Sequence, residues 1–146
     1  MKNIKLIFID IDGVLNNFHF YKITPHYTWD LFDPISVSLL NQIIKAYDVD
    51  LILSSDWRKT YGVKETQKVF SKNKINKKIT GYISSSCNKE EGIKMYLEFL
   101  YKKSNNVHFV VLDDEKINVN NLIQTNPKYG LTISEYKKIN KIFKSV

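Results

Sequence analysis

The sequence Ile4-Lys5-Leu6-Ile7-Phe8-Ile9-Asp10-Ile11-Asp12-Gly13 gives the first indication of how this chain folds. Its first six residues are rich in Ile and Phe, as in a buried β-strand. Asp10 and Asp12 follow, and carboxylates two residues apart on an extended chain face the same way. Two negative charges this close are unfavourable unless a cation joins them or one is protonated. A carboxylate nucleophile, a neighbouring acid/base group and a divalent metal would satisfy this arrangement.

The composition is that of one ordinary globular domain. The chain has 146 residues, of which 43% are hydrophobic, so it is long enough to bury one core. No repeat or Pro/Gly-rich linker divides it, and we predict a single domain over residues 1–146. Its longest apolar stretches are strand-length and interrupted by charges, which argues against a membrane span or a signal peptide. We therefore expect a cytoplasmic protein whose single cysteine, Cys87, forms no internal disulfide.

The net charge is strongly positive. Lys and Arg number 22 against 15 Asp and Glu, which gives +7 at neutral pH. Lysine-rich surfaces attract polyanions such as nucleic acid, although abundant Lys, Asn and Ile can equally reflect a biased genomic base composition. Arg58 is the only arginine, which hints at a site that needs its planar, bidentate fork. The charge therefore favours an anionic partner without identifying it.

Strand-like and helical patterns alternate along the chain, which is typical of an α/β fold with a parallel sheet. Asp33 and Pro34 are expected to be the cap and first position of a helix with an apolar face. Further strands are predicted at residues 49–53, 107–112 and 122–125, and further helices after Asn88 and after Thr132, where Glu135 completes a capping box. We predict a Rossmann-like three-layer sandwich around a central parallel sheet.

The second predicted strand is followed by Ser54-Ser55-Asp56-Trp57-Arg58. The carboxyl ends of parallel strands meet at one edge of a sheet, so these residues lie near the first two acids. A hydroxyl there can hold the oxygens of a transferring phosphate, and Ser54 and Ser55 are both candidates for this role. Either serine can instead cap the next helix. Trp57 and Arg58 are predicted at the substrate rim, although Trp57 can also be core packing.

Two further groups are predicted at the same edge. Asn88 begins a helix whose first turn carries Lys89, an ammonium that can neutralise a bound phosphate. Lys94 is the next candidate, but it lies a turn further from the edge. The third strand ends in Asp113 and Asp114, which are hard oxygen ligands of the kind that Mg²⁺ prefers. Together with the first two acids, they predict a magnesium site.

Residues 8–16, Phe-Ile-Asp-Ile-Asp-Gly-Val-Leu-Asn, resemble the first motif of the haloacid dehalogenase-like (HAD) phosphohydrolases. The resemblance implies that Asp10 attacks phosphorus as the nucleophile and that Asp12 is the general acid/base. It further implies that Ser54 is the second-motif hydroxyl and Lys89 the third-motif lysine. The implied Mg²⁺ ligands are Asp10, the backbone carbonyl of Asp12, Asp113, and Asp114 either directly or through water.

A narrower resemblance covers nearly the whole chain. Residues 54–58, 112–114 and 126–132 together are similar to the small phosphatase-like domains found in multi-domain RNA repair proteins. Asn126 stands where an acid is expected before Pro-Lys-Tyr-Gly-Leu. The segments after the first two motifs are short, so the resemblance implies a capless or minimally capped site. Residues 17–32 are rich in aromatic side chains and are expected to form either a small flap that stacks bases or folded core.

We therefore predict an Mg²⁺-dependent phosphomonoester hydrolase that forms an aspartyl-phosphate and acts on nucleotide or nucleic-acid-end phosphates. Two alternatives stay open. A phosphate-accepting receiver domain also gathers acids, a hydroxyl and a lysine at a sheet edge, but it lacks the second acid of the first motif. A non-catalytic basic module that binds RNA would account for the charge alone. The sequence does not predict the oligomeric state.

Overall fold

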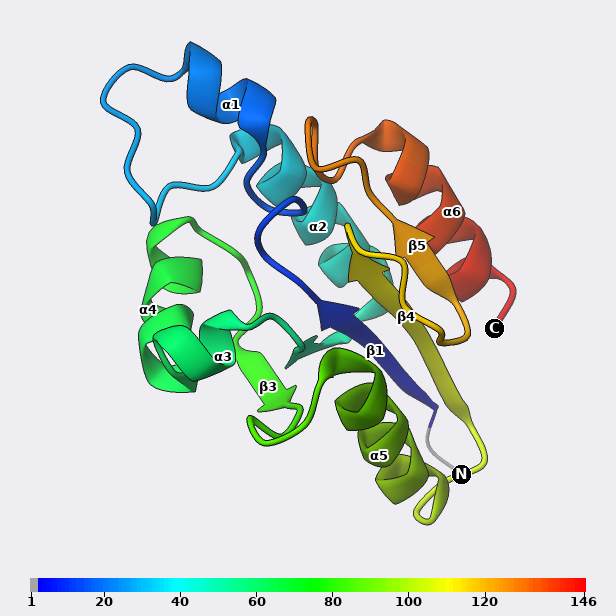
Figure 1. Cartoon of the computed structure of the whole chain (residues 1–146). Helices are drawn as coiled ribbons and strands as arrows, with labels where there is room; N and C mark the ends of the chain where they lie inside the picture. The colour runs from blue at the N-terminus through cyan, green and yellow to red at the C-terminus, as the bar shows by residue number, and fades with distance from the viewer. Residues whose placement is uncertain (1–2) are drawn as a thin grey trace.

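The computed structural model describes residues 3–146, which form one five-stranded parallel sheet and six helices (Figure 1). The sheet order is β3-β2-β1-β4-β5. The strands are β1 (Ile4–Ile9), β2 (Asp50–Leu53), β3 (Ile79–Tyr82), β4 (Val107–Asp113) and β5 (Leu122–Gln124). The helices are α1 (Phe18–Ile23), α2 (Pro34–Tyr47), α3 (Trp57–Thr60), α4 (Val63–Lys72), α5 (Lys89–Tyr101) and α6 (Ile133–Lys144). The predicted α/β class is confirmed.

The sheet is covered on both faces, which makes the three layers. Alternate residues of β1 point to opposite faces: Ile7 and Ile9 join one buried cluster, whereas Leu6 and Phe8 join the other. The first cluster contains the apolar side chains of α2, α4 and α6, and the second those of α5. Figure 1 shows α5 in front of the sheet, with α2 and α6 behind it. Because both faces of the central strands β1 and β4 are buried, these strands are almost continuously apolar.

Helix starts were the best predicted local features. The side chain of Asp33 accepts a hydrogen bond from the backbone N–H of Ile35, with Pro34 in the first helical position of α2. Asn88 caps α5 in the same way, and Thr132 and Glu135 form the predicted capping box of α6. The helix α4 and the strand β3 were not predicted. Among the described residues, no helix is long and apolar enough to cross a membrane.

The strand order fixes where a site can form. The chain builds from β1 outward to β2 and β3, then crosses to β4 and β5 on the other side of β1. Ligands of such sheets bind outside the carboxyl ends of the strands where this order reverses, here between β1 and β4. Receiver domains have the order 2-1-3-4-5 instead. The topology therefore separates this chain from the receiver alternative and points to the ends of β1 and β4.

Candidate active site

Asp10 lies at the centre of the carboxyl edge, directly after β1. Its backbone N–H donates to the carbonyl of Leu112 in β4 (3.0 Å), which fixes it between the two strands of the switch point. The side chain is almost completely buried. Burial, followed by the negative charge of Asp113, raises the pKa of Asp10 from 3.8 to about 8. A carboxyl in this state is poised to exchange a proton for a cation.

Three of the predicted metal ligands converge. One carboxylate oxygen each from Asp10, Asp113 and Asp114 lie within 4.8 Å of one another. Gly13 is needed for this approach: it has φ +81°, and a Cβ there would lie 2.4 Å from Oδ2 of Asp114. Burial also raises the pKa of Asp113. Hard oxygen donors whose charges repel one another fit a divalent cation such as Mg²⁺, which would offset that repulsion.

Lys89, and not Lys94, reaches the acids. Its Nζ lies 3.1 Å from Oδ2 of Asp113, 3.5 Å from Oδ2 of Asp10 and 3.4 Å from Oε1 of Glu115, and its side chain is 11% exposed. Burial by itself lowers the pKa of Lys89, but the carboxylates of Asp10 and Asp113 outweigh it, so the net pKa is raised and the ammonium stays charged. Lys94 is 51% exposed and pairs with Glu90, one turn further along α5.

The two serines after β2 have different roles. Ser54 is completely buried, and its hydroxyl has no hydrogen-bond partner within the part of the chain that the structure describes. A buried unpartnered hydroxyl is costly and calls for a ligand. The Ser55 hydroxyl instead accepts a hydrogen bond from the backbone N–H of Trp57 (3.1 Å) at the start of α3. This bond supports the start of α3, as in the capping alternative, and leaves the Ser55 O–H able to donate, so its phosphate contact stays a prediction.

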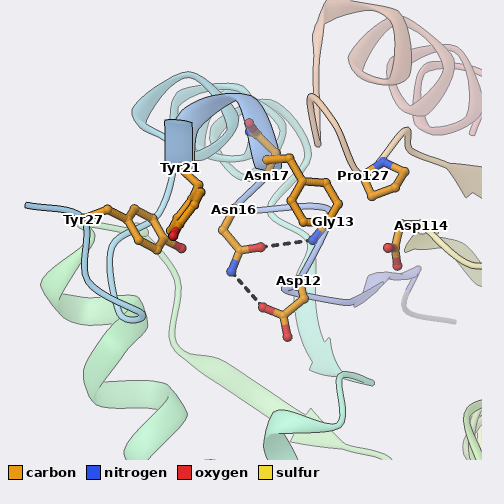
Figure 2. A pocket seen from close by; sticks show the side chains of 9 residues that line it. Asp12, Gly13, Asn16, Asn17, Tyr21, Tyr27, Asp114 and Pro127 are labelled. Atoms are coloured by element: carbon orange, nitrogen blue, oxygen red, sulfur yellow. Dashed lines mark hydrogen bonds between the residues drawn. The ribbon is translucent and has the colours of Figure 1, made fainter. Parts of the chain in front are cut away.

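Asp12 faces away from the three metal-site carboxylates. Its Oδ1 accepts from the Asn16 side-chain amide (2.8 Å), and its Oδ2 accepts from the indole N–H of Trp57 (3.1 Å). The other end of the Asn16 amide accepts from the backbone N–H of Gly13 (3.0 Å), as Figure 2 shows. Both carboxylate oxygens are therefore held in place, and only the backbone carbonyl of Asp12 is left as its predicted metal contact. The orienting role of Asn16, the last residue of the first motif, was not predicted.

Trp57 and Arg58 were predicted at the substrate rim, and the structure buries both side chains. Trp57 is buried, and its ring packs against Trp29, Tyr61 and Phe32 while its N–H holds Asp12. The guanidinium of Arg58 is 0% exposed. The helix α3 begins after the three residues that follow β2, and both side chains are buried in its first turn. Both side chains form hydrogen bonds with neighbouring parts of the site.

Arg58 ties two loops of the site together. Its Nη1 donates to the carbonyls of Ser54 (2.8 Å) and Ser55 (3.0 Å) after β2. Its Nη2 and Nε donate to the carbonyls of Cys87 (2.8 Å) and Ser84 (3.3 Å) before α5. The planar fork of an arginine can satisfy four carbonyls in this way, whereas a single ammonium cannot. These hydrogen bonds within the protein explain why this position needs a guanidinium.

Replacing Arg58 with lysine is therefore expected to destabilise the fold. The variant keeps the charge but leaves buried carbonyls unpaired, which costs about 2–4 kcal/mol in the free energy of unfolding. Chemical denaturation of Arg58→Lys measures this, with Lys59→Arg on the exposed neighbouring position as the control. A change for Arg58→Lys as small as that of the control would show that the guanidinium does not hold the two loops.

An open pocket lies beside Asp12. It has a volume of about 480 Å³ and is lined by Asp12, Gly13, Asn16, Asn17, Phe18, Tyr21, Tyr27, Asp114 and Pro127. Most of its aromatic wall comes from residues 17–32, the predicted flap. None of the residues of α1, all of which are described, is buried, so this part of the segment is not folded core. Figure 1 shows α1 and the loop after it beyond the carboxyl ends of the strands.

Acids gathered in this way at the switch point of a parallel sheet are typical of phosphohydrolases of the α/β class. A comparison with protein families supports this class. The profile described as the HAD domain in Swiss Army Knife RNA repair proteins matches residues 6–135, and the chain belongs to this family. Comparison with curated proteins and with solved structures gave no significant match.

Proposed function

We propose that the protein is an Mg²⁺-dependent phosphomonoester hydrolase that acts through a phosphorylated Asp10. The observation that carries the proposal is the convergence of Asp10, Asp113 and Asp114 beside Lys89 and the unpartnered hydroxyl of Ser54. This arrangement offers a nucleophile, a cation site and a phosphate cradle within one small space. When bound by the three carboxylates and the carbonyl of Asp12, Mg²⁺ supplies positive charge that offsets the charge on the phosphoryl oxygens.

In the first step, a carboxylate oxygen of Asp10 attacks phosphorus and the bond from phosphorus to the leaving oxygen breaks. Asp12 donates a proton to that oxygen, which leaves as an alcohol. Lys89 and the Ser54 hydroxyl hold the non-bridging oxygens, where the negative charge is spread during the transfer. Asp10 is left as an aspartyl-phosphate.

In the second step, Asp12 is a carboxylate and accepts a proton from the attacking water. The new bond from water oxygen to phosphorus replaces the bond to Asp10, and inorganic phosphate leaves. The two hydrogen bonds from Asn16 and Trp57 support this double role, because they keep the Asp12 carboxylate in one orientation for both proton transfers.

As substrates we propose nucleotides or the phosphorylated ends of nucleic acids. The family is named for RNA repair proteins, and a net charge of +7 favours a polyanion. The site carries only the short α1 segment instead of a large cap, which leaves room for the end of a polymer. A cytoplasmic location is consistent with such substrates.

A phosphate-release screen with Mg²⁺ tests the proposal. We expect turnover on mononucleotides or on phosphorylated RNA or DNA ends, and less on sugar phosphates and phosphopeptides. Multiple turnovers of any phosphomonoester support the hydrolase. Absence of release from every substrate, together with RNA binding that weakens steeply with salt, would instead identify a non-catalytic RNA-binding module, the alternative that the positive charge favours.

Replacing Trp57 with phenylalanine is expected to impair proton transfer selectively. The variant loses the hydrogen bond to Asp12, and kcat/KM for an alkyl phosphate should fall about 10-fold, on the scale of one hydrogen bond to a charged group. kcat/KM for 4-nitrophenyl phosphate, whose leaving group needs no proton, should change less than about threefold. Trp29→Phe, in the same aromatic cluster but without a bond to Asp12, is the control. Equal losses on both substrates would contradict the orienting role.

A further inference from the structure

The pocket beside Asp12 is on the leaving-group side of the reaction. Asp12 lines this pocket, whereas its carboxylate takes no part in the group formed by Asp10, Asp113 and Asp114. The residue that protonates the leaving oxygen has to lie next to that oxygen. The alcohol part of the substrate therefore extends from the phosphate into this pocket. Figure 2 shows Tyr21 and Tyr27 on one side of it, Pro127 and Asp114 on the other, and Asp12 between them.

The lining of the pocket selects a flat, uncharged group. Phe18, Tyr21 and Tyr27 supply aromatic rings, and Pro127 supplies an apolar wall. Tyr21 and Tyr27 pack edge to face, with centroids 5.1 Å apart. No lysine or arginine of residues 3–146 lines the pocket, whereas Asp12 and Asp114 do. Rings beside carboxylates favour an aromatic group by stacking and disfavour a second phosphate.

The aromatic wall is fixed before any ligand arrives. The backbone N–H groups of Phe18 and His19 donate to the carbonyls of Pro127 (3.2 Å) and Lys128 (2.9 Å). These bonds join the start of α1 to the loop after β5, so both sides of the pocket are held together. Asn17 caps α1 and donates to Asp33 at the start of α2 (2.8 Å). A preformed pocket binds a rigid ring with little loss of conformational entropy.

The two side-chain amides in the pocket each accept one hydrogen bond and donate one within the protein. Asn16 accepts from Gly13 and donates to Asp12. Asn17 accepts from the backbone N–H of Phe20 and donates to Asp33. Reading the edge of a base requires free donors and acceptors, whereas stacking accepts every base because each has a π face. Stacking on the three rings can therefore hold any of the four bases.

We propose that this pocket holds the base of a nucleoside monophosphate through the rings of Tyr21, Tyr27 and Phe18. The pocket should show little preference among the four bases, and a nucleotide with a second phosphate on the reacting phosphate should bind less well. The proposal rests on the hydrolase function above and assigns the leaving-group side of that site. Its chemistry is shared by a free mononucleotide and by the terminal nucleotide of a strand.

The test compares kcat/KM for the better of the 3′- and 5′-monophosphates of adenosine with that for the matching ribose phosphate. Stacking of one base predicts a ratio of about 10 to 100. The four bases should agree within about fivefold, and the corresponding diphosphate should be poorer. A ratio near one would overturn the proposal while leaving the hydrolase intact, because ribose phosphate would still be cleaved. Cleavage of other phosphomonoesters but of neither of these two compounds would overturn only the pocket assignment, whereas no cleavage of any phosphomonoester in the screen would overturn the hydrolase itself.

Two variants test whether the preference for the mononucleotide over ribose phosphate arises in this pocket. Tyr21→Ala removes a ring from an exposed position on α1 and should lower kcat/KM for the mononucleotide about 10-fold while leaving ribose phosphate unchanged. Phe99→Ala removes an equally exposed ring from the far end of α5 and should change neither. Losses on both substrates for Tyr21→Ala, or equal losses in the two variants, would contradict the assignment. A phosphorylated oligoribonucleotide that outperforms the mononucleotide identifies a strand end as the source, and the reverse order identifies free nucleotides.

Discussion

Replacement of Asp10 by asparagine is expected to abolish turnover, with a loss in kcat of about 10⁴-fold or more, as when a covalent nucleophile is removed from other enzymes. The amide is a poor nucleophile, and it also removes one of the three carboxylates that would share the cation. Release of inorganic phosphate from 4-nitrophenyl phosphate measures the loss. Asp48→Asn, at an exposed acid at the end of α2, is the matched control and should retain full activity.

The same substitution is expected not to weaken the fold. Burial and then the charge of Asp113 raise the pKa of Asp10 from 3.8 to about 8. Between these pH values the folded protein keeps the proton and the unfolded chain loses it, so this group lowers the stability of the cation-free protein as pH rises from about 4 to 8. The side chain of asparagine does not titrate, so Asp10→Asn removes this loss of stability.

Thermal unfolding in EDTA at several pH values separates the loss of turnover from any change in stability. The variant should be at least as stable as the wild type, and its advantage should grow towards pH 8. A variant that is inactive because it is unfolded, or one whose disadvantage grows with pH, would contradict the placement of Asp10 in the buried acid cluster.

Removal of the divalent cation is the second change with a large expected effect. Without Mg²⁺, the repulsion among Asp10, Asp113 and Asp114 is not offset and the phosphoryl oxygens lose their main positive partner. Excess EDTA should reduce phosphate release to background, and added Mg²⁺ should restore it. Because the ion binds the folded state only, Mg²⁺ should also raise the melting temperature. At 100 times its dissociation constant, it should add about 2.7 kcal/mol to the free energy of unfolding.

Asp113→Asn shows whether the effect of EDTA comes from loss of a cation at this site or from another effect of the chelator. This variant should need much more Mg²⁺ for half-maximal stabilisation, because a buried carboxylate ligand becomes neutral. Asp48→Asn should respond to Mg²⁺ as the wild type does. Full activity in EDTA, or equal Mg²⁺ stabilisation of Asp113→Asn and the wild type, would show that these acids do not form the cation site.

The features that were predictable from the sequence are those set by a few neighbouring residues. An apolar strand that ends in acids can be recognised without knowing the rest of the fold, which is why Asp10 and Asp113 were placed correctly at the sheet edge. Helix caps such as Asp33 are equally local. By contrast, the strand β3 has four residues and no buried face, and α4 carries little apolar surface, so neither gave a clear pattern.

The direction in which a side chain points was much harder to predict. Ser54 and Ser55 are adjacent and chemically identical, but of the two only the Ser54 hydroxyl has no partner among the described residues, because the Ser55 hydroxyl accepts from the backbone N–H of Trp57. Trp57 and Arg58 follow the loop after β2, and both side chains are buried in the first turn of α3. The pocket is made by α1 and the loop carrying Pro127, which are far apart in sequence, so no local pattern could reveal it.

The central claim, that Asp10 carries the phosphoryl group during turnover, is tested most directly by trapping it. In Asp12→Asn, 4-nitrophenyl phosphate should still phosphorylate the enzyme, because nitrophenolate leaves unaided, but hydrolysis lacks its base. Each protein should release one nitrophenolate rapidly, and mass spectrometry should find the phosphoryl group on the peptide containing Asp10. Steady release without a burst, or a phosphoryl group on any other residue, would contradict the account.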